Sequence, residues 1–109
     1  MIESVEYGEI IYNGERFKDV KIINQQPHEW IWKKDHTITL DDVKDMLDEV
    51  DVIVLGTGQE GLVAVEKEVI NACEKKHIHV HIEQTPTAVR LYNELEGHHI
   101  IGAIIHSTC

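Results

Sequence analysis

From about residue 39 onward, the apolar positions of this chain alternate between the spacing of a buried strand and that of an amphipathic helix. Val52–Leu55 is a continuous apolar run, which is typical of a strand buried on both faces. Runs of this kind predict strands at 51–55 and 99–105, and the alternation of apolar residues with histidines predicts a further strand at 78–82. Apolar residues at helical spacing predict helices over about 66–76 and from Thr85 to Gly97. This βαβαβ order favours parallel strands joined by right-handed crossovers.

A further helix is predicted ahead of this core. Thr39 is a good N-cap, and Asp41 and Asp42 carry charges that favour the first turn of a helix. Apolar residues then recur at helical spacing as far as Val50. We therefore expect the core segment to span residues 39–109 and to begin with this helix.

Residues 1–24 have the pattern of antiparallel β structure. Asn13 and Gly14 lie between apolar runs, and both accept the positive φ angles that a two-residue hairpin turn requires. We expect this hairpin region to extend the sheet of the core or to cover it. The predicted fold is α/β, a single three-layer domain over residues 1–109 with a mixed sheet and an N-terminal antiparallel hairpin layer.

Composition limits the partners and the location of the chain. A length of 109 residues suits one domain, and 42% apolar with 28% charged residues is ordinary for a globular protein. The net charge of −10 argues against nucleic acid and against an anionic membrane surface as partners. Because no long apolar run or N-terminal signal occurs, we expect a cytoplasmic protein. Its two cysteines make no disulfide framework.

A glycine-rich loop after the first core strand is the leading candidate for a ligand pocket. It contains Gly56, Thr57, Gly58 and Gln59. In α/β folds, ligands bind at the carboxyl ends of the strands, where such a loop lies. Thr85 is the predicted N-cap of the last helix, whose start would offer backbone donors at the same edge, with Glu83 nearby.

Three interpretations of this loop differ in what they require. A dinucleotide site is disfavoured because Glu60 would repel a pyrophosphate, the helix starts several residues late and a second nucleotide-binding half is missing. An uncharged or weakly anionic ligand, held by backbone N–H groups and by Thr57 and Gln59, stays open. So does a tight turn that needs positive φ and binds nothing. No cofactor is predicted.

Histidine and cysteine residues raise two further hypotheses. His77, His79 and His81 fall on one face of the second core strand, but no carboxylate or cysteine accompanies them at metal-ligand spacing, so no native metal is expected. His106 and Cys109 could form a nucleophile pair only if the last strand ended before them, because alternation otherwise places them on opposite faces. No catalytic residue is predicted.

Trp30 and Trp32 lie in a segment that follows Pro27. Tryptophan side chains at such positions are more often covered by the fold than exposed. Exposed tryptophans would be natural anchors for a protein partner, because aromatic side chains bury a large area in an interface. These two are therefore the predicted partner-binding residues.

Several segments together resemble a known family. They are Gly56-Thr57-Gly58-Gln59 after the buried strand, Thr85-Pro86-Thr87-Ala88-Val89 before Tyr92-Asn93, and the ending His106-Ser107-Thr108-Cys109. In these segments the chain is similar to the small α/β family of the adipogenesis-associated domain protein and a mitochondrial complex I assembly factor, and it looks most like a free-standing archaeal member. The resemblance implies a mixed sheet with a hairpin layer and no established enzymatic activity. In the assembly-factor branch it implies action through protein–protein contact.

The leading hypothesis is a non-enzymatic protein-binding or assembly module, which could also self-associate through an exposed strand edge or through the tryptophans. The alternative is a small-ligand or enzymatic pocket at the strand carboxyl ends around Gly56–Gln59. This alternative has one geometric condition. The glycine loop and the start of the last helix must open at the same edge of the sheet.

Overall fold

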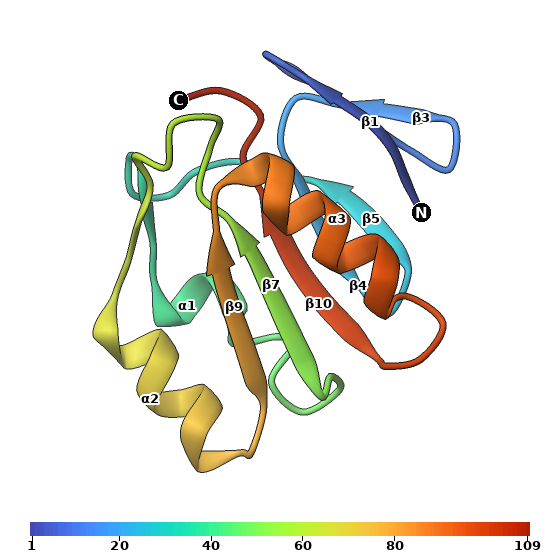
Figure 1. Cartoon of the computed structure of the whole chain (residues 1–109). Coiled ribbons are helices and arrows are strands. Elements are labelled where there is room, and N and C mark those ends of the chain that lie inside the picture. Colours follow the sequence, from blue (N-terminus) through green and yellow to red (C-terminus); the bar gives the residue numbers. More distant parts are fainter.

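The computed structural model describes residues 1–109, and one five-stranded sheet runs through it in the order β5-β4-β10-β7-β9 (Figure 1). Its strands are β4 (Val20–Ile23), β5 (Gln26–Glu29), β7 (Val52–Gly56), β9 (His79–Glu83) and β10 (Ile101–Ile105). Both β9 and β10 pair with β7 in parallel, whereas β4 pairs antiparallel with β10 and β5 pairs antiparallel with β4. The predicted mixed sheet with a βαβαβ core is confirmed.

The N-terminal residues form a second, three-stranded antiparallel sheet. Its strands are β1 (Ile2–Glu6), β2 (Glu9–Tyr12) and β3 (Glu15–Phe17). The predicted turn joins β2 to β3, and Asn13 and Gly14 have φ angles of 48° and 84°. Ile2 and Ile10 pack into the same apolar cluster as Ala103 of β10. The N-terminal region therefore covers the main sheet with β1–β3 and extends it with β4.

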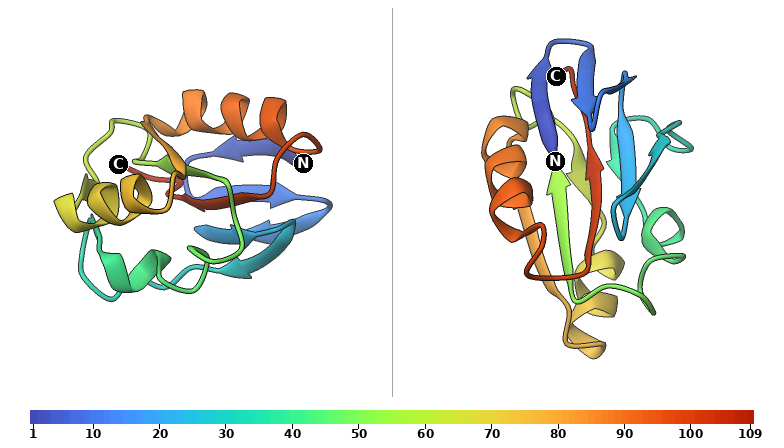
Figure 2. Two further views of the ribbon diagram at one scale, coloured as in Figure 1. Left: turned by 90° about the horizontal axis from the view of Figure 1, so that it is seen from below. Right: turned by 90° about the vertical axis from the view of Figure 1, so that its right-hand side faces the viewer.

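Helices lie on both faces of the main sheet (Figure 2). They are α1 (Leu40–Val43), α2 (Lys67–Lys75) and α3 (Thr85–Leu95). α3 shares one face with the β1–β3 sheet, and Tyr92 contributes to the apolar cluster there. α1 and α2 lie on the other face, where a second cluster includes Met46, Leu55 and Val69. β7 and β10 are buried on both faces, which explains their uninterrupted apolar sequence.

α1 is much shorter than the predicted helix, because turns replace it from Lys44 to Glu49. Lys21 reaches across from β4, and its Nζ donates to the carbonyl oxygen of Asp42. In an α-helix that oxygen would accept from the N–H of Met46. Met46 N instead donates to the carbonyl oxygen of Val43 at 3.0 Å. The helical spacing thus predicted burial correctly but not the hydrogen bonding.

Candidate functional site

The glycine loop and the start of α3 meet at one end of the sheet, beyond the carboxyl ends of β7, β9 and β10 (Figure 1). Thr57 N donates to the carbonyl oxygen of Glu83 at 2.9 Å. Gly58 N donates to Oγ1 of Thr85 at 2.9 Å, and Thr85 N donates back to the carbonyl oxygen of Gly58 at 2.9 Å. The geometric condition for the pocket hypothesis is therefore met at this edge, which we call the carboxyl rim.

The last residues of the chain fill the space over this loop. Gln59 N donates to the carbonyl oxygen of Thr108 at 2.8 Å. The N–H groups of Glu60 and Leu62 both donate to the carbonyl oxygen of Cys109, at 3.1 and 3.2 Å. In this conformation the loop donors hold the chain's own carbonyl groups, so a ligand could use them only after residues 108–109 had moved away.

Thr85 is not the N-cap of α3 as predicted. The N-cap is Gln84, and Thr85 is the first helical residue, with its side chain completely buried. Oγ1 of Thr85 donates to the carbonyl oxygen of His106 at 2.6 Å and accepts from Gly58 N. The hydroxyl therefore links the ends of β7 and β10 and accepts from the glycine loop, not from the N–H groups of the helix start.

A buried carboxylate–imidazole pair lies beside the loop. His106 follows β10, and its Nδ1 donates to Oδ2 of Asp19 at 2.9 Å, with side-chain exposures of 7% and 5%. Trp32 Nε1 also donates to Oδ2, at 2.7 Å, and Ser107 N donates to Oδ1, at 2.7 Å. Because a carboxylate can only accept, Nδ1 carries a proton, and in the neutral imidazole the lone pair is on Nε2.

Sequence patterns did not single out Asp19. It lies between β3 and β4, 87 positions before His106, in a region read only as antiparallel β structure. The pairing of β4 with β10 brings the two residues together. An aspartate directly before a buried strand was the sole local sign, and that pattern is too common to indicate a site.

His36 and Cys109 complete a cluster around His106. His36 directly precedes the short strand β6 (Thr37–Ile38), which pairs in parallel with β8 (Ala64–Val65). Its ring lies edge-to-face against that of His106, with centroids 5.7 Å apart. The metal-ligating atoms of His36, His106 and Cys109 all lie within 4.8 Å of one another. We call these three residues and Asp19 the rim cluster.

The condition for a meeting of His106 with Cys109 is met, because β10 ends at Ile105. Tyr7 also lies against the thiol, with its hydroxyl 3.7 Å from Sγ of Cys109, and this hydrogen bond raises the pKa of Tyr7. The hydroxyl of Thr108 lies 3.0 Å from Nε2 of His106. The rim cluster thus offers a thiol, two imidazoles and an anchored carboxylate, groups that can hold a cation or carry a proton.

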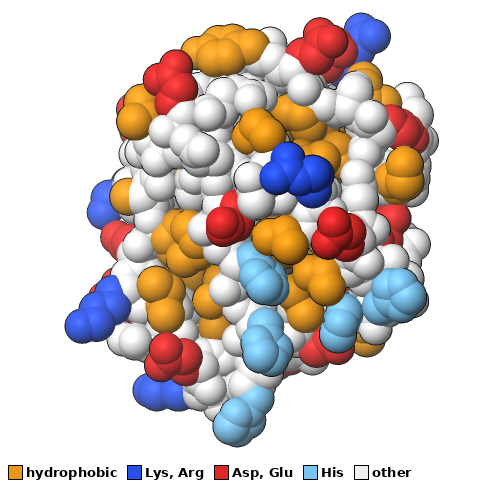
Figure 3. Space-filling model, viewed as in Figure 1, with side chains coloured by type: hydrophobic (Ala, Val, Ile, Leu, Met, Phe, Trp, Pro, Cys, Tyr) orange, Lys and Arg blue, Asp and Glu red, His pale blue; other side chains and the backbone are white.

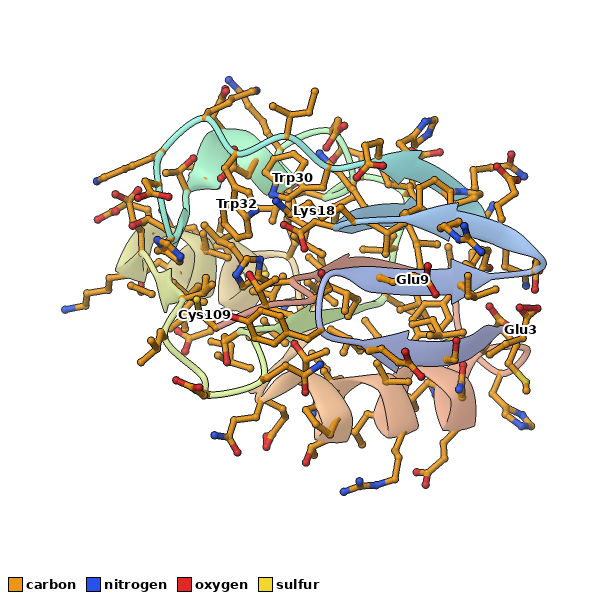
Figure 4. All side chains as sticks on the ribbon, turned by 90° about the horizontal axis from the view of Figure 1, so that it is seen from above. Glu3, Glu9, Lys18, Trp30, Trp32 and Cys109 are labelled. Carbon is orange, nitrogen blue, oxygen red and sulfur yellow. The ribbon has the colours of Figure 1, made fainter.

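The two tryptophans lie on the α1 side of the carboxyl rim (Figure 4). Trp30 is 9% exposed and belongs to the apolar cluster on that face, and Trp32 is half-buried. Their rings meet edge-to-face with centroids 5.9 Å apart, and Trp32 lies 5.2 Å from the ring of His106. In this conformation they offer a partner little surface, whereas Ile31 between them is 76% exposed.

The cavity found in the molecule lies at the opposite end of the sheet. Its volume is about 310 Å³, and turns that precede β7 and β10 and follow β4 form its lining, which includes Asn24, Asp51, His98 and His99. This lining is polar and contains none of the predicted site residues. The cavity and the rim cluster are therefore separate features.

His77, His79 and His81 do not share one strand face as predicted. β9 begins at His79, and His77 lies in the preceding turn with a φ of 57°. His79 and His81 lie opposite Val52 and Val54 of β7 and so project on the α3 side of the sheet. Figure 3 shows a row of histidine side chains on this face.

Residues 2–105 match the sequence profile of a family described as "Protein of unknown function (DUF498/DUF598)". The chain belongs to this family. A conserved hypothetical protein from Pyrococcus horikoshii has the same fold as this DUF498/DUF598 chain, with a TM-score of 0.89 and 26% identity. The match covers 100% of this chain and 99% of that one.

Two more distant structures show the same fold. A protein from Bartonella henselae, described as an outer membrane protein, has a TM-score of 0.82 and 21% identity over 99% of this chain and 94% of that one. A Bordetella pertussis protein, described as a Mth938-like domain, has a TM-score of 0.74 and 17% identity over 98% of this chain and 85% of that one. No helix of the DUF498/DUF598 chain is both long and apolar enough to cross a membrane.

Proposed function

We propose that this DUF498/DUF598 chain is a non-enzymatic protein-binding module that accepts an extended segment of a partner along the open edge of β9. The observation that carries the proposal is the place of β9 at one end of the sheet, where it pairs with β7 alone. An edge strand presents unpaired N–H and C=O groups, to which an extended segment can add as a further strand.

β9 is the most suitable edge that the two larger sheets offer. β5, at the other end of the main sheet, contains Pro27, which has no N–H to donate. In the small sheet, β3 has three residues, and the outer side of β1 is bound at Ile2 by the side chain of Asn93. β9 has five residues and contains neither proline nor glycine.

The two sides of β9 supply different contacts. His79 N donates to the carbonyl oxygen of Asp51 at 3.2 Å, toward the sheet, and alternation then directs the main-chain groups of Val80 and Ile82 outward. The side chain of Ile82 is 38% exposed and offers apolar contact on the α2 side. His79 and His81 offer hydrogen bonds on the α3 side.

Charge indicates the chemistry of the partner segment. The net charge of −10 favours a segment rich in Lys and Arg, because complementary charges speed encounter and suppress wrong partners. The resemblance to the family of the adipogenesis-associated domain protein and the complex I assembly factor also supports a role through protein contact. That resemblance concerns the mode of action, and complex I itself is not proposed as a partner.

The proposal can be tested with short labelled peptides and fluorescence anisotropy. The probe alternates Lys and Val, and a Glu–Val peptide and an N-methylated Lys–Val peptide serve as controls. Replacing Ile82 by Pro removes an outward N–H while an edge strand tolerates the ring. Ile82→Thr keeps the N–H and loses the apolar side chain, so it is the matched control.

We expect the Lys–Val peptide to bind, and Ile82→Pro to weaken its binding by about tenfold or more, equal to about 1.4 kcal/mol. Ile82→Thr should weaken it less, and both control peptides should bind less tightly. Equal binding of the Lys–Val peptide to wild type and Ile82→Pro would overturn the proposal, as would no binding at all. If the wild type formed a dimer and Ile82→Pro dissociated it, the occupant of the β9 edge would be a second copy of this chain and not a different partner.

The pocket hypothesis has one observation in its favour. Three N–H groups of residues 59–62 already converge on carbonyl oxygens, so the loop is built to hold oxygen acceptors. If residues 108–109 leave, a small ligand could take their place. A thermal-shift screen with nucleotides, sugars and metabolites tests this, and a stabilisation that is lost in Gln59→Ala is the expected result. If no compound raised the melting temperature, the pocket hypothesis would be wrong.

A further inference from the structure

The rim cluster places three metal-ligating side chains together, at a place that the proposed function does not use. His36, His106 and Cys109 come from segments far apart in the sequence, and their ligating atoms lie within 4.8 Å of one another. Two imidazole nitrogens and one thiolate sulfur are a donor set that suits Zn²⁺ and related borderline-soft cations. The cluster also contains the carboxylate of Asp19, which contacts His106 and is not one of the three ligands.

We propose that His36, His106 and Cys109 bind a divalent cation of the zinc type, with a fourth coordination position left open. Tetrahedral Zn²⁺, with bonds of about 2.0 Å to nitrogen and about 2.3 Å to sulfur, places its ligands roughly 3.5 Å apart. Since the three atoms lie within 4.8 Å of one another, each pair would have to approach by at most about 1.3 Å. Three protein ligands with an open position are typical of zinc sites that bind water or a further ligand.

Asp19 gives His106 the orientation that a metal ligand requires. Metal-binding histidines almost always donate their second N–H to a carboxylate, a carbonyl or water, which fixes the tautomer. Nδ1 of His106 donates to Asp19 in this way at 2.9 Å, and both side chains are buried. Nε2 is then the ligating atom, and the hydroxyl of Thr108, now 3.0 Å away, must turn aside.

Main-chain hydrogen bonds already position the other two ligands, Cys109 and His36. The carbonyl oxygen of Cys109 accepts from Glu60 N and Leu62 N, so the tail is bound to the glycine loop. The carbonyl oxygen of His36 accepts from Ala64 N at 2.9 Å. The side chain of His36 is exposed and can adjust to the metal without disturbing the core. Positioned main chain of this kind lowers the cost of assembling the site.

The test uses the full chain, reduced and freed of metal by a chelator, and titrates it with Co²⁺ as a spectroscopic probe for Zn²⁺. A bond from cobalt to a thiolate gives a charge-transfer absorption that histidine alone does not give. Cys109→Ser and His36→Gln remove one ligand each, from a half-buried and an exposed position. Cys73→Ala removes the buried second thiol, and the double variant His79→Gln/His81→Gln removes histidines of β9, so these two are the controls.

We expect one Co²⁺ per chain, with a thiolate charge-transfer band that Zn²⁺ abolishes on displacement. Cys109→Ser should remove the band, and both ligand variants should weaken binding by about tenfold or more, whereas both controls should bind as the wild type does. Circular dichroism of the metal-free variants checks that each is folded. No binding to the reduced wild-type chain would overturn the proposal. So would binding without the band, or binding lost in the β9 double variant and retained in Cys109→Ser.

Discussion

Gly58 shows how much one residue determines at the carboxyl rim. Its φ is +105°, and a Cβ there would lie 2.3 Å from the carbonyl carbon of Cys109, closer than folded proteins allow. Gly14 also has a positive φ, of +84°, but a Cβ there would meet no atom within 4 Å. Gly14 is therefore required only by its positive φ, whereas Gly58 is required both by its positive φ and by the close approach of Cys109.

Replacing each glycine by alanine should reveal that difference. Gly14→Ala should lower the free energy of unfolding by about 1–2 kcal/mol, the cost of a left-handed backbone at an alanine. Gly58→Ala should lower it by more, because the Cβ also pushes residues 108–109 off the loop. Urea unfolding measures both losses, and faster hydrogen exchange at the N–H groups of Gln59 and Glu60 would report the displaced tail. Equal losses in the two variants would contradict the steric account.

At the scale of elements, one side chain joins α3 to β1. Oδ1 of Asn93 accepts from Ile2 N at 2.9 Å, and its Nδ2 donates to the carbonyl oxygen of Ile2 at 2.9 Å. A side-chain amide thus takes the place of a neighbouring strand along the outer side of β1. This contact is also why β1 offers a partner no open edge at that point.

Asn93→Ala should therefore loosen β1 more than the rest of the fold. We expect the free energy of unfolding to fall by about 1–3 kcal/mol, because two part-buried main-chain groups lose their partners. Hydrogen exchange should become faster at Ile2 and its neighbours in β1 and change little in β7 and β10. The adjacent, exposed Glu94→Ala is the control. If hydrogen exchange became faster uniformly across the chain, or did not become faster in β1, the side chain of Asn93 would not be what holds this strand.

At the scale of the whole molecule, Glu96 connects the C-terminal end of α3 to the N-terminal region of the chain. The hydroxyls of Tyr12 and Tyr92 donate to its Oε2 at 2.9 and 2.7 Å, and the amino group of Met1 lies 2.8 Å from its Oε1. Burial opposes ionisation of Glu96, but the bonds from the ammonium and both tyrosines outweigh it and lower its pKa below the ordinary value for a glutamate. Burial raises the pKa of Tyr12 to about 12, so that hydroxyl stays a donor at neutral pH.

The sign of the resulting pH dependence follows from this lowered pKa. At a pH near the ordinary pKa of a glutamate, the unfolded state binds more protons at Glu96 than the folded state does. The stabilisation from the carboxylate is thus complete above that pH and is lost as the pH falls through the folded value. Glu96→Gln should be less stable than wild type at about pH 7, and the gap should shrink at about pH 3. Urea unfolding at both pH values measures the gap, and a constant gap would refute this assignment.

Local signals in the sequence were enough to predict β7, α2, β9, α3 and β10 and their order. Apolar runs marked β7 and β10, alternating apolar residues marked β9, and the Asn13-Gly14 pair marked its hairpin. The strand–loop–helix order placed the glycine loop at the carboxyl rim. Each of these signals depends on residues within about one element of each other, because burial and turn geometry act on neighbouring positions. The mixed sheet with its hairpin layer was what the family resemblance implied.

Contacts between distant segments decided the rest, and only the tertiary structure contains them. The pairing of β4 with β10 brings Asp19 to His106, and the reach of Lys21 to the carbonyl of Asp42 cuts α1 short. The return of residues 108–109 over the glycine loop fills the predicted pocket. In each case a polar group satisfies another that lies far away in the chain, and neither residue carries a local mark of its partner.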